Sequence, residues 1–186
     1  RLEQTGGEVR VVETENGRVD LDALAEAVAD ARLACFSAVT WTHGTQLPVG
    51  DLVDITHDAD AFALVDAVQV PGHRAMDVHE WGADAVAAAG HKWLLGPWGA
   101  GFLYVDREVA DSLVPSAVGY RSVTDPTADD LDYAAGAKRF EIGTTSPAPH
   151  AGLIAAIDRI EVVGIDTIES RIETLPDRLD AELRAQ

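Results

Sequence analysis

Lysine occurs only twice in this sequence, at Lys92 and Lys138, although 14 residues are basic. Lys92 follows the apolar run 85–89 and precedes a Trp-Leu-Leu-Gly-Pro segment, a place where solubility does not explain a charged side chain. A lysine amine can form a Schiff base with a carbonyl compound when desolvation lowers its pKa. Lys92 is therefore the first candidate for chemistry.

Asp66 and Gln69 end a second apolar run, which starts near residue 61. A buried carboxylate is costly unless a cation or hydrogen-bond donors meet it. Ligands of open parallel sheets bind beyond the carboxyl ends of the strands, and a right-handed crossover returns the chain to the same edge. We therefore expect Asp66, Gln69, His91 and Lys92 to face one crevice.

Ordinary structural roles remain open for the same four side chains. Asp66 could cap the following turn, or pair with Lys92 as a structural ion pair. Gln69 could be a surface turn residue, and His91 a loop histidine with its hydrogen bonds satisfied. A bound cofactor with an aldehyde and a basic nitrogen would explain all four together.

Apolar runs and helical patterns alternate along the first 106 residues, which predicts an α/β fold with a mostly parallel sheet and flanking helices on both faces. We expect a short helix near residue 78 as well. The predicted strands are 8–13, 32–39, 61–69, 85–89 and 99–106, and the longer helices are 19–30, capped by Asp20, and 47–60.

A long loop rich in Gly, Pro, Thr and Asp follows, and then two helices are expected, 147–163 and 166 onward. We therefore divide the chain into residues 1–145, part of a large domain, and 146–186, connecting helices that begin a small domain. Because the chain starts at Arg1 and stops inside an amphipathic pattern, we expect it to be a fragment.

The net charge of −18 argues against nucleic-acid and membrane partners, because both surfaces are anionic. An acidic, lysine-poor composition is typical of proteins that work in concentrated salt, such as a haloarchaeal cytoplasm. The single Cys35 excludes an internal disulfide and a Cys-rich zinc site, and His73 and His79 lack a third ligand at metal spacing. No run reaches the length of a membrane span, and a cytoplasmic location is expected.

Three segments resemble successive motifs of one family: ALVDAVQVPGHRAMDV, GADAVAAAGHKWLLGPWGAGFLYV and KRFEIGTTSPAPHAGLIAAI. In this order, D-x-x-Q, G-H-K and R-F-E-x-G-T resemble the class V aminotransferases. These are fold-type I enzymes that use pyridoxal 5'-phosphate and include cysteine desulfurases and isopenicillin N epimerase-like proteins. The resemblance extends over essentially the whole chain and implies the large domain of that fold.

The resemblance implies a role for each matching residue. Lys92 would form the Schiff base and move the proton at the substrate Cα. Asp66 would pair with the pyridine nitrogen, and Gln69 would donate to the phenolic oxygen. His91 would contact the phosphate, and Thr144 would reach the phosphate of a neighbouring subunit in a homodimer with a shared active site.

Other positions depart from the desulfurase pattern. Ala89 replaces a serine that binds phosphate, the segment TWTHG places Thr42 near the cofactor, and Trp93 is closer to the epimerase-like branch. We therefore expect a pyridoxal-phosphate enzyme acting at Cα of an amino acid in that branch, with a cysteine desulfurase or selenocysteine lyase as the alternative. A catalytically silent subunit is a third hypothesis. The substrate-carboxylate arginine and the stacking aromatic would lie outside this chain.

Overall fold

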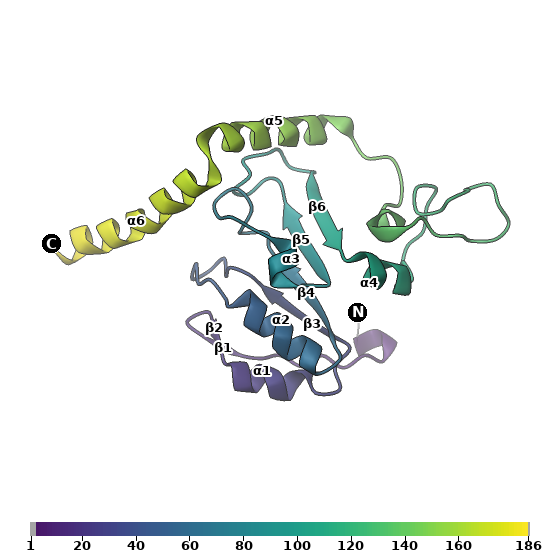
Figure 1. The fold of residues 1–186 in the computed structure, drawn as a ribbon, viewed down its shortest axis with the longest axis horizontal. Coiled ribbons are helices and arrows are strands. Elements are labelled where there is room, and N and C mark those ends of the chain that lie inside the picture. Colours follow the sequence, from purple (N-terminus) through teal and green to yellow (C-terminus); the bar gives the residue numbers. More distant parts are fainter. Residues whose placement is uncertain (1–2, 186) are drawn as a thin grey trace.

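The computed structural model describes residues 3–185, and its centre is a four-stranded sheet (Figure 1). The strands lie side by side in chain order: β3 (Leu33–Ser37), β4 (Phe62–Asp66), β5 (Ala85–Ala89) and β6 (Gly101–Val105). The first three are parallel, and β6 runs antiparallel to β5. The prediction of a mostly parallel α/β sheet is confirmed.

Helices cover one face of this sheet. Side chains of α2 (Val49–Asp58) pack on buried alanines and valines of β4 and β5, and α3 (Val78–Trp81) adds to the same layer. The helix α1 (Leu21–Val28) packs against α2, and the carboxylate of Asp20 caps its amino end as predicted.

The other face of the sheet differs from the expectation of helices on both sides. Leu33 is 50% exposed and Leu103 is 44% exposed, and Cys35 on the same face is exposed too. Among residues 3–185, the layer of helices lies on the opposite side. The alternation of buried and exposed positions along β4 and β5 follows from this one-sided cover.

The strand predicted at 8–13 is wrong. The chain instead forms η1 (Glu3–Thr5) and a small antiparallel pair, β1 (Thr14–Glu15) and β2 (Arg18–Val19). The apolar side chains that suggested a strand are largely in solvent, with Val11 74% exposed. Alternation alone does not make a strand where no neighbouring strand accepts its hydrogen bonds.

The long connection predicted after residue 106 is present, between α4 (Arg107–Ser112) and the helices of the carboxyl end. It contains a turn of 3-10 helix, η2 (Gly136–Phe140). Arg139 in this turn is buried; it pairs with Asp111 and donates to the carbonyl oxygens of Leu113 and Ala134. The guanidinium therefore holds the connection against α4.

The two predicted terminal helices are α5 (Pro147–Val163) and α6 (Ile165–Arg184). Leu153 of α5 packs on the loop after β5, where methyl groups added to Gly90 or Gly96 would come within 2.9 Å of its side chain. Figure 1 shows α6 projecting away from the sheet. None of the helices in residues 3–185 is long and apolar enough to cross a membrane. The domain division at residue 146 stays a prediction.

Candidate active site at the carboxyl edge of the sheet

The sheet register brings the predicted segments together. Asp66, the last residue of β4, pairs with Ser37 of β3 on one side and with Ala87 of β5 on the other. Lys92 follows the end of β5 at Ala89 by three residues. Both chemical groups therefore extend from the same edge of neighbouring parallel strands, where ligands of such sheets bind.

Asp66 is exposed, so the expectation of a buried carboxylate is wrong. The reason is its position at the end of β4, on the face that α2 and α3 do not cover. Its Oδ1 accepts from the backbone N–H of Val68 at 2.9 Å, and Oδ2 accepts from the Ser37 hydroxyl at 3.4 Å. The turn-capping role is thus real, and each carboxylate oxygen keeps further lone pairs for a ligand.

Lys92 is also exposed, and its amine takes part in no hydrogen bond or ion pair recorded for residues 3–185. The hypothesis of a structural ion pair with Asp66 is therefore wrong. The desolvated setting expected for this amine is not formed by the described residues either, because the loop that carries Lys92 lies on the surface.

Gln69 is more than a surface turn residue. Its side-chain Oε1 accepts a hydrogen bond from the indole N–H of Trp93 at 3.0 Å, which joins the loop after β4 to the loop after β5. The ring of His73 lies 4.9 Å from that of Trp93. Sequence reasoning missed this contact, although an indole directly after the candidate lysine was a usable signal.

His91 is half-buried and stacks on an aromatic neighbour. Its ring lies 3.8 Å from that of Trp98, with 18° between the planes. Trp98 itself is 78% exposed. The stacking holds the imidazole next to Lys92, and no hydrogen bond among residues 3–185 involves its ring nitrogens, which can bind a polar group.

The two candidate threonines remain apart from this cluster. Thr42 lies in the exposed loop after β3, and its hydroxyl contacts Nδ1 of His43. Thr144 lies in the connection before α5, and its hydroxyl contacts that of Tyr120. Neither contacts Asp66 or Lys92 through a hydrogen bond among the described residues.

Cys35 lies on β3, on the same face as Asp66. Although Cys35 is exposed as a residue, partial desolvation of its thiol raises the pKa of this group, and the nearby charge of Asp66 raises it further. The thiol is therefore protonated at neutral pH, whereas a nucleophilic cysteine requires the thiolate. Cys35 is therefore unsuited to attack sulfur as a nucleophile.

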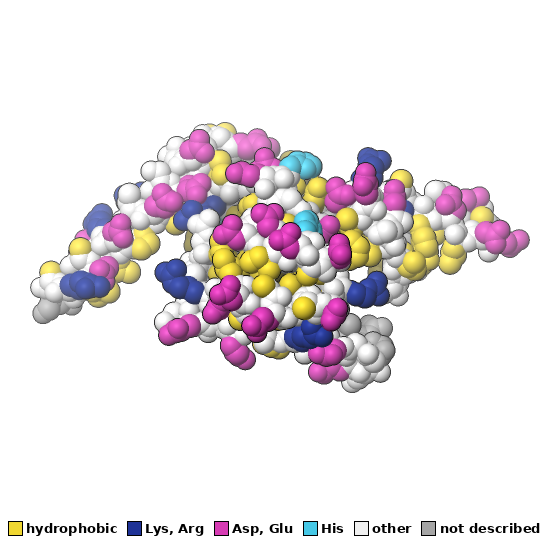
Figure 2. Space-filling view, turned by 60° about the horizontal axis from the view of Figure 1, so that its bottom comes forward, with side chains coloured by type: hydrophobic (Ala, Val, Ile, Leu, Met, Phe, Trp, Pro, Cys, Tyr) yellow, Lys and Arg dark blue, Asp and Glu magenta, His cyan; other side chains and the backbone are white. Residues whose placement is uncertain are grey.

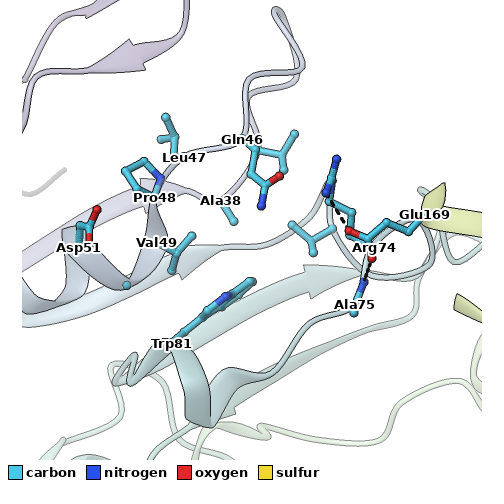
Figure 3. A pocket seen from close by; sticks show the side chains of 13 residues that line it. Ala38, Gln46, Leu47, Pro48, Val49, Asp51, Arg74, Ala75, Trp81 and Glu169 are labelled. Carbon is cyan, nitrogen blue, oxygen red and sulfur yellow. Dashed lines mark hydrogen bonds and ion pairs between the residues drawn. The ribbon is translucent and has the colours of Figure 1, made fainter. Parts of the chain in front are cut away.

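A pocket of about 250 Å³ lies elsewhere, between α2, the loop after β4 and α6 (Figure 3). Glu169 of α6 lies at the rim of this pocket. Its carboxylate accepts a hydrogen bond from the guanidinium of Arg74 at 2.8 Å and one from the backbone N–H of Ala75 at 3.2 Å. Trp81 also lines it. None of the six residues predicted to bind the cofactor is among its lining residues, so this pocket is not the candidate site.

Acidic side chains are spread across the face seen in Figure 2, with few basic ones between them. This distribution agrees with the net charge of −18.

The family model for class-V aminotransferases matches residues 1–186, and the chain belongs to this family. Pyridoxal phosphate is the cofactor of the family, and the fold is that of the fold-type I enzymes.

Among curated proteins, the chain resembles a probable cysteine desulfurase of Halobacterium salinarum, with 35% identity over 177 residues, 94% of this chain and 42% of the relative. A probable cysteine desulfurase of Methanothermobacter thermautotrophicus is 37% identical over 183 residues, 97% of this chain and 46% of the relative. The chain thus spans less than half the length of these curated relatives.

Solved structures of cysteine desulfurases and a C–S lyase are also similar to this chain, which again covers less than half of each. An apo cysteine desulfurase from Thermococcus onnurineus superposes with a TM-score of 0.88 at 30% identity, over 99% of this chain and 46% of that one. The cystine C-S lyase C-DES, in complex with its product cysteine persulfide, gives a TM-score of 0.71 at 31% identity, over 81% and 40%. A C-DES variant with glycine covalently linked to its pyridoxal-phosphate cofactor gives 0.73 at 30% identity, over 85% and 42%.

Proposed function

We propose that the protein carrying this chain is a pyridoxal-phosphate enzyme that removes sulfur from cysteine. The observation that carries the proposal is the exposed Lys92 amine at the carboxyl edge of β5, which has no hydrogen-bond or ion-pair partner among residues 3–185 and is joined through the next residue to the Gln69 loop. The relatives and solved structures above are named for cysteine desulfuration or C–S cleavage. They favour the alternative from the sequence over the epimerase-like hypothesis.

The residues at this edge fit the cofactor by their chemistry. Lys92 offers an amine with no competing partner, and Asp66 offers carboxylate lone pairs. Gln69 keeps its Nε2 as a donor because Trp93 occupies Oε1. This set matches an aldehyde, a basic ring nitrogen and a phenolic oxygen.

When bound, the cofactor would supply a sink for the electron pair released at the substrate Cα. Lys92 would hold the cofactor covalently and then take and return the proton at Cα, as its single amine can do once the substrate displaces it. Lys138 lies in η2, in the connection after α4, and not at the carboxyl edge of the sheet.

Asp66 and Gln69 would orient the ring and set its charge. The Asp66 carboxylate would keep a proton on the ring nitrogen, because a negative charge beside that nitrogen favours its protonated form. The Gln69 amide would donate to the phenolic oxygen and stabilise its negative charge. Ser37 and Val68 would hold the Asp66 carboxylate in place.

The phosphate would be held by His91 of one subunit and by Thr144 of its partner, with Thr42 near the cofactor. Among the described residues, the Thr144 hydroxyl contacts Tyr120 and no candidate residue, and this supports a shared site in a homodimer. We further propose that the enzyme is cytoplasmic, acts on a free amino acid, and has no nucleic-acid or membrane partners.

An epimerase-like reaction is the second candidate, because Ala89 has no hydroxyl where the desulfurase pattern has serine and Trp93 follows the lysine. Both reactions begin with loss of the Cα proton. In epimerisation a proton returns to the opposite face of Cα, whereas in desulfuration the C–S bond breaks, Cβ gains a proton to give alanine, and the sulfur appears as sulfide when a reductant is added.

The test is incubation with L-cysteine, with alanine and sulfide measured under reducing conditions, and with chiral chromatography of L- and D-amino acids in parallel. The protein is expressed with whatever flanking sequence its gene encodes. We expect alanine and sulfide in equal amounts, and neither with Lys92→Arg, which keeps the charge. Inverted amino acid without sulfide would favour the epimerase-like reaction, and no turnover of either kind would leave the silent-subunit hypothesis.

A further inference from the structure

The contact between Trp93 and Gln69 fixes the direction of an amide. An indole N–H is a donor only, so the group that meets it at 3.0 Å must be the carbonyl oxygen of the Gln69 side chain. The amide nitrogen Nε2 consequently points away from Trp93. Among the hydrogen bonds of residues 3–185, none uses this Nε2.

The packing around Trp93 holds this arrangement in place. Gly72 has φ +96°, and a methyl group there would overlap the backbone carbonyl of Trp93 at 2.2 Å. Only glycine allows the two loops to approach this closely. His73 is 7% exposed, and its ring packs at 4.9 Å on the indole, tilted by 32°.

His73 is itself fixed by its backbone neighbour. Its Nδ1 lies 3.1 Å from the carbonyl oxygen of Val70, and because a carbonyl only accepts, Nδ1 carries the proton. The segment that follows Gln69 therefore forms a support for Trp93, and Trp93 in turn orients Gln69.

We propose that Trp93 is a positioning residue that locks the Gln69 amide so that Nε2 donates to the phenolic oxygen of the cofactor. This inference rests on the proposed function and assigns a role to the residue next to Lys92. Without the indole N–H, the amide could turn over and present Oε1 to an oxygen that is itself an acceptor. The cofactor would then lose a donor and gain a repulsive contact.

The experiment measures the affinity for pyridoxal phosphate by absorbance titration of the protein with its natural flanking sequence, checked by the fraction of Lys92 labelled after borohydride reduction. Trp93→Phe keeps an aromatic ring against His73 and removes only the donor. We expect affinity about fivefold weaker for Trp93→Phe, the factor of one ordinary hydrogen bond, and a similar or larger loss for Gln69→Leu. Trp81→Phe, a tryptophan outside the site, should leave the affinity unchanged.

The double variant decides between an orienting and a merely structural role. If Trp93 acts through Gln69, Trp93→Phe has no further effect in the Gln69→Leu background. In ¹H–¹⁵N spectra, Gln69→Leu should also shift the indole resonance of Trp93. Equal weakening by Trp93→Phe in both backgrounds, or unchanged affinity, would overturn the inference and leave the proposed function standing. A wild-type protein that takes no cofactor on Lys92 would overturn the proposed function and this inference with it.

Discussion

The residues of the candidate site are exposed or half-buried polar groups, and most of them are held by one or two contacts. Asp66 is held by a backbone N–H and a hydroxyl, Gln69 by an indole, and His91 by stacking on Trp98. Lys92 alone has no such contact recorded among the described residues. The side chains proposed to orient the cofactor ring therefore have fixed positions before the cofactor binds. Lys92, which must form and release a bond to the cofactor, is not held in this way.

His73 carries a prediction about pH. Burial lowers the pKa of its imidazole below the ordinary value of 6.5. Below that value the unfolded chain binds a proton that the folded chain resists, so this contribution to stability is lost as the pH falls from about 7 through the lower folded pKa. We expect the free energy of unfolding to drop between pH 7.5 and pH 5.5 in denaturant titrations.

The control removes the titrating group. His73→Asn should flatten this pH dependence, because its side-chain amide does not take up a proton in this range. Parallel curves for His73→Asn and the wild type would contradict the assignment.

At the scale of elements, the site depends on the contact of two loops, one after β4 and one after β5. Gly72 is the point of closest approach, with its positive φ and the Trp93 carbonyl beside it. The strands fix where these loops start, and the glycine allows them to touch.

Substitution at Gly72 tests that contact. Gly72→Ala should lower the free energy of unfolding by at least about 2 kcal/mol, because φ is unfavourable and the added methyl group collides with backbone. Gly50→Ala is the matched control: it lies in α2 with open space around it and should raise stability by about 0.5 kcal/mol. Thermal or urea unfolding of both variants measures this, and a Gly72→Ala protein as stable as Gly50→Ala would refute the close contact.

Sequence patterns predicted the strands 32–39, 61–69, 85–89 and 99–106 and the two terminal helices well, because each has a clear period or a capping residue. They failed at 8–13, where alternating apolar residues meet no partner strand. They also predicted that Asp66 and Lys92 lie at the carboxyl edge of the sheet. They did not predict that both side chains are exposed, because exposure depends on which elements cover the sheet. The Trp93 to Gln69 bond joins residues 24 apart, so the indole directly after the candidate lysine indicated a donor but not which residue accepts from it.

At the scale of the whole molecule, one sheet face is open, α6 projects from the body, and the chain spans less than half the length of the curated relatives named above. The acidic surface is distributed rather than confined to one site (Figure 2). Such a charge destabilises the folded chain through self-repulsion when salt is low.

Salt dependence follows from this charge. With a net charge of −18, we expect the melting temperature to rise by several degrees between 0.1 and about 2 M KCl, because ions shorten the Debye length to a few ångströms. Differential scanning calorimetry measures it, with sucrose at equal osmolality as an uncharged control. Higher stability at low salt would contradict adaptation to concentrated salt.

The most direct test of the central claim uses the scarcity of lysine. The protein, with its natural flanking sequence, is incubated in KCl with pyridoxal phosphate, reduced with borohydride, digested and mapped by mass spectrometry. We predict an adduct on Lys92 and none on Lys138, the only other lysine of this chain. No adduct on Lys92, or equal labelling of the two lysines, would contradict the assignment of Lys92 as the cofactor lysine.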